Sequence, residues 1–178
     1  AAYSNGYVFA KFLLEAGAYI TEANTRPKSQ ALVYAIEYGD RKTVKLLRGL
    51  WEPPNDLANL AGLGNLEKVQ VFLNSQTDEV DLVHGLALAC MNQHMEIADY
   101  LIKQGVDINA EWSLHEPATI LHHLAFFGKL EMVQFLVERG ADTNIKDFRY
   151  QADALGWAKY NGQDQVAAYL KQLKNCLL

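Results

Sequence analysis

Residues 118–147 form a unit in which two short apolar-periodic segments are separated by Gly128 and closed by Gly140. The second segment places apolar residues at spacings of three and four, on one face of a helix: Leu130, Val133, Phe135, Leu136 and Val137. Each segment is about ten residues long, which is too short for an isolated helix to be stable in water. A helix-turn-helix hairpin of this kind therefore needs neighbouring copies of itself to complete its core.

Copies of this unit recur along the chain. The pattern predicts six, the first of them truncated, at residues 1–24, 27–52, 53–80, 81–110, 115–146 and 147–178. In the second and third copies the closing turn is degenerate. Pro53-Pro54 stands at the end of the second copy, and no helix can continue through it, because consecutive prolines are not compatible with a helix interior. The pattern therefore specifies no hairpin geometry between residues 48 and 82. We predict one all-α solenoid domain over residues 1–178.

Three motifs stand out in the fifth copy. Thr119-Ile120-Leu121-His122 stands where a known repeat has T-P-L-H, Gly128-Lys129-Leu130-Glu131 where it has G-H-L-E, and Gly140-Ala141-Asp142-Thr143-Asn144 where it has G-A-D-V-N. With a period of about 33 residues, the chain resembles the ankyrin repeat family. The resemblance implies stacked helix pairs with short hairpin fingers, a structural role for His122, and partner binding on the concave face.

Charge and cysteine content limit the partners and compartments to be expected. The formal net charge is −5 with 16 lysines and arginines, which argues against nucleic acid or an anionic membrane surface as the main partner. Cys90 and Cys176 are the only cysteines, so a reducing compartment is expected. Without a long apolar run or a secretory signal, the default expectation is a cytoplasmic protein. The truncated first copy indicates a fragment or a processed product.

Histidines are the residues most suggestive of chemistry. His122 and His123 are adjacent on a predicted helix and point about 100° apart, which suits a shared metal ion poorly. No nucleophile has a recognisable base beside it, and no phosphate-binding glycine loop occurs. We therefore expect no enzyme, no metal and no cofactor. A metal or enzymatic site around His115, His122 and His123 is the less favoured alternative.

The two variable positions before each inter-helix turn carry at least one large apolar or aromatic residue in every copy. In ankyrin-like stacks these positions line the concave face beside the fingers, and the fingertips near the last copies add three more aromatic residues, Trp112, Phe148 and Tyr150. Together they predict a binding surface of eight residues: Tyr38, Met91, Trp112, Phe126, Phe127, Phe148, Tyr150 and Tyr160. We predict a monomeric, non-catalytic module that binds a protein or peptide there, with Glu37, Glu111 and Glu116 favouring a partner of basic character. The alternatives are packing of these residues between repeats, or a structural spacer within a larger protein.

Overall fold

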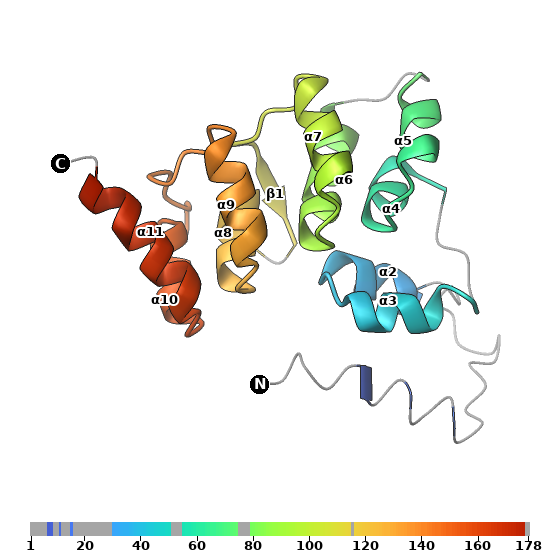
Figure 1. Ribbon diagram of the computed structural model, residues 1–178, viewed down its shortest axis with the longest axis horizontal. Coiled ribbons are helices and arrows are strands. Elements are labelled where there is room, and N and C mark those ends of the chain that lie inside the picture. The colour runs from blue at the N-terminus through green and yellow to red at the C-terminus, as the bar shows by residue number, and fades with distance from the viewer. Residues whose placement is uncertain are drawn as a thin grey trace.

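The computed structural model describes the greater part of the chain. The described residues are Tyr7, Val8, Lys11, Glu15, 30–50, 55–74, 79–114 and 116–176. Most of the truncated first copy, predicted at 1–24, lies outside the described residues, as does His115. Within the described part the chain is mainly helical, and successive helices form pairs joined by short turns (Figure 1).

The helix pairs follow one another along the chain. They are α2 (Gln30–Glu37) with α3 (Arg41–Leu47), α4 (Leu57–Gly62) with α5 (Leu66–Leu73), α6 (Glu79–Met91) with α7 (Met95–Lys103), α8 (Ile120–Phe126) with α9 (Leu130–Glu138), and α10 (Ala154–Tyr160) with α11 (Asp164–Cys176). The predicted all-α solenoid of helix-turn-helix units is confirmed.

A left-handed residue lies in the turn of each pair. Gly39 has a φ of 62° and Gly128 a φ of 68°, values that a residue without a Cβ adopts at little cost. In the α6–α7 pair Gln93 takes this conformation with a φ of 62°. In some pairs a polar residue then caps the N-terminus of the second helix. In α3 the Asp40 side chain is this N-cap and accepts a hydrogen bond from the Thr43 amide at 3.1 Å. The same turn is therefore built from different local sequences.

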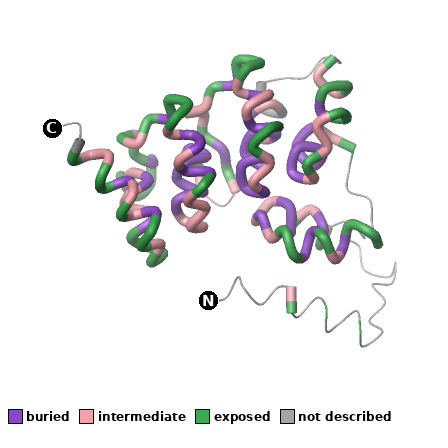
Figure 2. The backbone as a smooth tube through the Cα atoms, in the orientation of Figure 1, coloured by how far each residue is buried: buried purple, intermediate pink, exposed green. Residues whose placement is uncertain are grey.

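Buried residues from all five helix pairs form one hydrophobic core cluster along the array (Figure 2). The first helix of a pair is the more deeply buried one: every residue of α8 from Ile120 to Ala125 is buried. The second helix is amphipathic, and α7 buries only Ile97, Ala98 and Leu101. Among the described helices none has the length and apolar character required to cross a bilayer.

A short hairpin separates the α6–α7 pair from the α8–α9 pair. Strands β1 (Glu111–Ser113) and β2 (Pro117–Thr119) are antiparallel, with Trp112 opposite Ala118. Helix α6 packs along α4, and α8 packs along α10, but α6 touches α8 only slightly because β1 lies beside it (Figure 1). The hairpin therefore widens the stack at this point, and the buried Trp112 side chain helps to fill the space.

The α2–α3 pair leaves the row formed by the other pairs and lies across the ends of α4 and α6 (Figure 1). The Asn92 side-chain amide donates to the Ile36 carbonyl at 2.7 Å, and the Lys129 ammonium donates to the Gly39 carbonyl at 3.0 Å. In a linear stack each repeat contacts only its neighbours. Here the turn of the second copy contacts both the fourth and the fifth copies, whose first helices, α6 and α8, touch each other only slightly.

Candidate functional site

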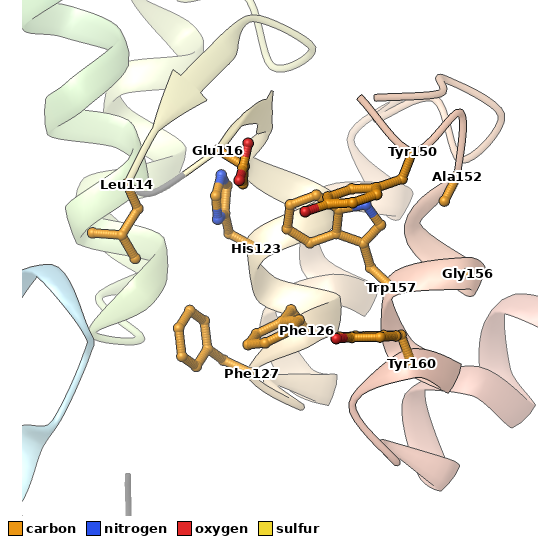
Figure 3. A pocket seen from close by; sticks show the side chains of 10 residues that line it. All are labelled: Leu114, Glu116, His123, Phe126, Phe127, Tyr150, Ala152, Gly156, Trp157 and Tyr160. Atoms are coloured by element: carbon orange, nitrogen blue, oxygen red, sulfur yellow. The ribbon is translucent and has the colours of Figure 1, made fainter. Parts of the chain in front are cut away.

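An apolar pocket of about 390 Å³ lies between α8, α10 and the turn of the β1–β2 hairpin (Figure 3). It is lined by ten residues: Leu114, Glu116, His123, Phe126, Phe127, Tyr150, Ala152, Gly156, Trp157 and Tyr160. Tyr150 and Tyr160 are 59% and 87% exposed, so the pocket reaches solvent beside them. A site of this volume with a mostly apolar wall is of the kind that holds a small ligand or a large side chain.

Two helices present the main aromatic wall. Helix α8 carries His123 and Phe126 three residues apart, and α10 carries Trp157 and Tyr160 at the same spacing, so each pair shares one helix face. The Phe126 ring lies 6.0 Å from the Trp157 ring at an interplanar angle of 74° and 6.5 Å from the Tyr160 ring at 26°. These contacts between rings on neighbouring helices hold the wall in one arrangement.

Asp147 organises the other side of the wall. Its carboxylate accepts hydrogen bonds from the Tyr150 amide at 2.6 Å, the Ala152 amide at 3.0 Å and the Trp157 indole Nε1 at 3.0 Å. All three donors belong to residues that line the pocket. The chain between Tyr150 and Ala152 turns through Gln151, which has a φ of 51°. One buried carboxylate thus fixes both the loop and the indole ring.

The Asp147 carboxyl is ionised at neutral pH. Its side chain is only 2% exposed, and this burial would by itself raise its pKa. The hydrogen bonds from Trp157, Tyr150 and Ala152 stabilise the carboxylate more strongly and hold the pKa of Asp147 below its usual range. The pocket wall therefore contains a full negative charge behind an aromatic surface.

The two adjacent histidines are held by the scaffold. The Nδ1 atom of His122 lies 2.7 Å from the Thr119 hydroxyl, and its Nε2 donates to the Ala152 carbonyl at 3.2 Å. The Nε2 of His123 donates to the Trp112 carbonyl at 3.1 Å. Both imidazole rings pack edge-on against Trp157, each 5.4 Å from it. Among the described residues, no group of three or more His, Cys, Asp or Glu side chains is placed to hold a metal ion.

A family model described as ankyrin repeats (3 copies) matches residues 57–147 and 86–176. The chain belongs to the ankyrin repeat family. The two matches together cover both helix pairs that build the pocket and the hairpin beside them. The T-P-L-H-like segment and its His122 thus have the architectural role that the resemblance implied, because Nδ1 contacts Thr119 of the same repeat and Nε2 donates to the Ala152 carbonyl of the next.

Relatives of this ankyrin array are found in several much longer proteins. Palmitoyltransferase AKR1 of Lachancea kluyveri is 34% identical over 92 residues, covering 52% of this chain and 12% of that protein. Ankyrin repeat and KH domain-containing protein mask-1 of Caenorhabditis elegans is 28% identical over 152 residues, covering 80% and 6%. Ankyrin repeat and SAM domain-containing protein 6 of Rattus norvegicus is 27% identical over 96 residues, covering 51% and 11%. The chain spans a small part of each relative.

Half of the side chains expected on a binding surface line the pocket of this ankyrin array: Phe126, Phe127, Tyr150 and Tyr160. Tyr38 lies beside them, because its ring meets the Phe127 ring edge-on with 6.1 Å between centroids. This contact joins the second and fifth repeats and results from the position of the α2–α3 pair. Partner binding by these residues stays a prediction.

The other expected residues take different places. Met91 is fully buried, so the prediction that it faces a partner is wrong: the α2–α3 turn covers this position, and Gly39 packs against the Met91 carbonyl. Trp112 is only 7% exposed and lies in β1, where its ring packs 5.0 Å from His123 instead of forming a fingertip anchor. Phe148 is 83% exposed but does not line the pocket.

Several lining residues were not anticipated as binding residues. Trp157 precedes Tyr160 by three residues on the same helix, so helical spacing alone could have indicated that the two share a face. Glu116 was expected only as part of a general acidic character. Leu114 belongs to the hairpin turn, and nothing in its local sequence indicates that this turn lies against α8.

Proposed function

We propose that this ankyrin array is a non-catalytic interaction module that binds a protein segment by taking one of its side chains into the aromatic pocket. The observation that carries the proposal is the pocket itself, which is open, holds about 390 Å³ and is walled by Phe126, Trp157 and Tyr160. Tryptophan and tyrosine in a partly enclosed site are typical of the residues that dominate binding energy in protein interfaces. Ankyrin repeats generally serve as protein interaction modules, which supports the same class of function.

The wall is preorganised for binding. Three of its aromatic residues stand on helices, and the hydrogen bond from Trp157 to Asp147 fixes the largest ring. A rigid wall loses little conformational freedom when a ligand enters, so more of the contact energy appears as affinity. The exposed rings of Tyr150 and Tyr160 continue the apolar surface to the rim of the pocket, where a longer segment would lie.

The polar groups in the pocket favour binding over catalysis. The ten lining residues include no serine, threonine or cysteine. His123 donates to the Trp112 carbonyl, and Glu116 accepts from Arg149, so these two side chains already have structural partners. The net charge of −5 favours a protein partner over nucleic acid.

The proposal is tested by selecting peptides from a displayed random library against the intact chain and measuring their affinity for the wild type and for three variants. We expect the selected peptides to lose at least about tenfold in affinity for Phe126→Ala and Tyr160→Ala, the loss typical of an interface hot spot. Phe148→Ala removes an aromatic ring of equal size that is exposed outside the pocket, and it serves as the matched control.

Far-ultraviolet circular dichroism of all three variants confirms that the helices are intact. Equal affinity for the wild type and both pocket variants would show that the pocket is not the binding site. Failure to select any peptide that competes at the pocket would instead favour the spacer role within a longer protein.

A further inference from the structure

Negative charge lies on two sides of the aromatic pocket. Glu116 is the one acidic residue among those that line it, and its side chain is 28% exposed at the rim. Asp147 lies behind the wall, where its carboxylate accepts hydrogen bonds from the Trp157 indole and from the backbone amides of Tyr150 and Ala152. No lysine or arginine lines the pocket. Arg149 pairs with Glu116 at the rim, so the negative charge without an arginine or lysine partner is that of Asp147, and it favours a cation over an anion in the pocket.

Among the described residues, no lysine or arginine forms an ion pair with the Asp147 carboxylate. Its oxygens are satisfied by neutral N–H groups. A charge in a poorly solvated wall is screened less than one at the surface, so it acts on the pocket interior more strongly. Because the Asp147 carboxylate accepts a hydrogen bond from the indole N–H, it also increases the electron density of the Trp157 ring, and electron-rich ring faces attract cations.

Arg149 shows that a cation is held at this rim. Its guanidinium donates to Glu116 and lies 5.4 Å from the centroid of the Tyr150 ring. The rim thus already provides the two elements that a bound cation uses, an aromatic face and a carboxylate. Arg149 itself does not line the pocket, so the space between Phe126, Trp157 and Tyr160 remains available for a ligand.

We infer that the pocket selects a methylated lysine of the bound protein segment and holds its alkylated ammonium group among the rings of Phe126, Trp157 and Tyr160. This inference rests on the proposed function. Aromatic faces within about 6 Å of a cation attract it, and the attraction grows when the site excludes water. The charges of Glu116 and Asp147 add to it.

The scarcity of hydrogen-bond acceptors distinguishes methylated lysine from the unmodified residue. A primary ammonium carries three N–H donors, and each donor that is buried without an acceptor weakens binding. Apart from the Glu116 carboxylate and the hydroxyls of Tyr150 and Tyr160 at the exposed rim, the wall is built mainly from aromatic rings and small apolar residues. Trimethylation removes all three donors and keeps the charge, so the modified group suits this wall better. A neutral aliphatic group fills the same space but gains nothing from the two carboxylates.

The first experiment compares choline with 3,3-dimethylbutan-1-ol, which has the same shape without the positive charge. Each compound is titrated into the whole chain while the indole N–H resonance of Trp157 is followed by NMR. We expect choline to bind at least about tenfold more tightly, as a partly desolvated cation–π contact predicts. Equal binding, or tighter binding of the alcohol, would overturn the inference and leave peptide binding through an apolar anchor intact.

The second experiment identifies the source of the cation. An acetylated and amidated Gly-Lys-Gly tripeptide is compared in its unmodified and trimethylated forms as a competitor of choline. We expect only the trimethylated form to displace choline at equal concentration. If choline binds and the trimethylated tripeptide fails to displace it, the assignment to lysine is wrong and the pocket takes a small quaternary ammonium compound.

Charge variants test the role of the rim. Glu116→Gln should weaken choline binding about threefold. Arg149 competes with the bound cation for the Glu116 carboxylate, so Arg149→Gln should strengthen choline binding by a similar factor. Glu111→Gln removes the same charge from the exposed part of the same hairpin outside the pocket and should have no effect. Affinity for the neutral alcohol should not change in any variant. Equal losses in Glu116→Gln and Glu111→Gln would contradict a specific site.

Discussion

The ammonium of Lys129 donates a hydrogen bond to the carbonyl oxygen of Gly39 at 3.0 Å, although 90 residues separate the two in sequence. Beside this bond the Tyr38 ring packs edge-on against Phe127, one of the residues that line the pocket. Burial lowers the pKa of Lys129, and the charge of Asp40 opposes this effect. One hydrogen bond and one ring contact therefore connect the α2–α3 pair to the pocket.

Lys129→Met should loosen this connection. Methionine keeps most of the apolar stem but leaves the Gly39 carbonyl without its donor, so we expect a loss of about 1 kcal/mol in unfolding free energy. Hydrogen exchange followed by mass spectrometry should show faster exchange in α2 and α3 and little change in α10 and α11. Lys103→Met, which removes an exposed lysine of α7, is the control. Unchanged exchange in α2 and α3 would mean that other contacts hold the pair in place.

Gly39→Ala should destabilise the protein more than Gly162→Ala. Both glycines have a positive φ, 62° and 67°, so both substitutions carry a similar backbone penalty of about 1–2 kcal/mol. A Cβ at Gly39 would lie 2.2 Å from the Met91 carbonyl oxygen, whereas a Cβ at Gly162 meets nothing within 4 Å. The difference in unfolding free energy between the two variants, measured by urea denaturation, reports only the steric contact between the new Cβ at position 39 and the Met91 carbonyl oxygen. Equal losses would show that the α2–α3 turn moves away without cost.

Asp147→Asn should destabilise the array by about 2–4 kcal/mol, because buried N–H groups of the pocket wall lose a charged acceptor. Asp142→Asn is the matched control: Asp142 also accepts an amide hydrogen bond in its turn, from Asn144 at 2.8 Å, but it is exposed. Urea denaturation followed by tryptophan fluorescence gives both values. A similar small loss in the two variants would show that the carboxylate is not required to hold Trp157.

Stability should decrease as the pH falls below about 6.5. Burial lowers the pKa of both His94 and His122 from the ordinary value of 6.5. Between that value and the lower pKa of the folded state, the unfolded chain binds protons that the folded chain does not, so the free energy of unfolding rises with pH there. Urea midpoints at pH 7.5 and 5.5 test this expectation, since carboxylates titrate at lower pH. His94→Asn should reduce the difference between the two midpoints, and an unchanged difference would exclude His94 as a contributor.

The sequence by itself determined the repeat architecture, because the signals for it are local. Apolar spacing defines the buried face of a helix within two turns, and a left-handed residue such as Gly128 ends a helix without reference to distant residues. The same local information placed Phe126 and Tyr160 before their turns, and both residues line the pocket. Position within the repeat identified three of the four expected residues that line the pocket: Phe126, Phe127 and Tyr160.

Only the tertiary structure decided which of those positions are accessible. Met91 and Phe126 occupy equivalent places in their repeats, yet Met91 is fully buried and Phe126 lines the pocket. The difference arises because the α2–α3 turn covers Met91, and the β1–β2 hairpin separates its repeat from the next one. The exposure of a side chain depends on which distant segment lies over it. The hydrogen bond from Lys129 to Gly39 joins residues 90 positions apart, and neither the apolar periodicity nor the turn pattern around either residue indicates it.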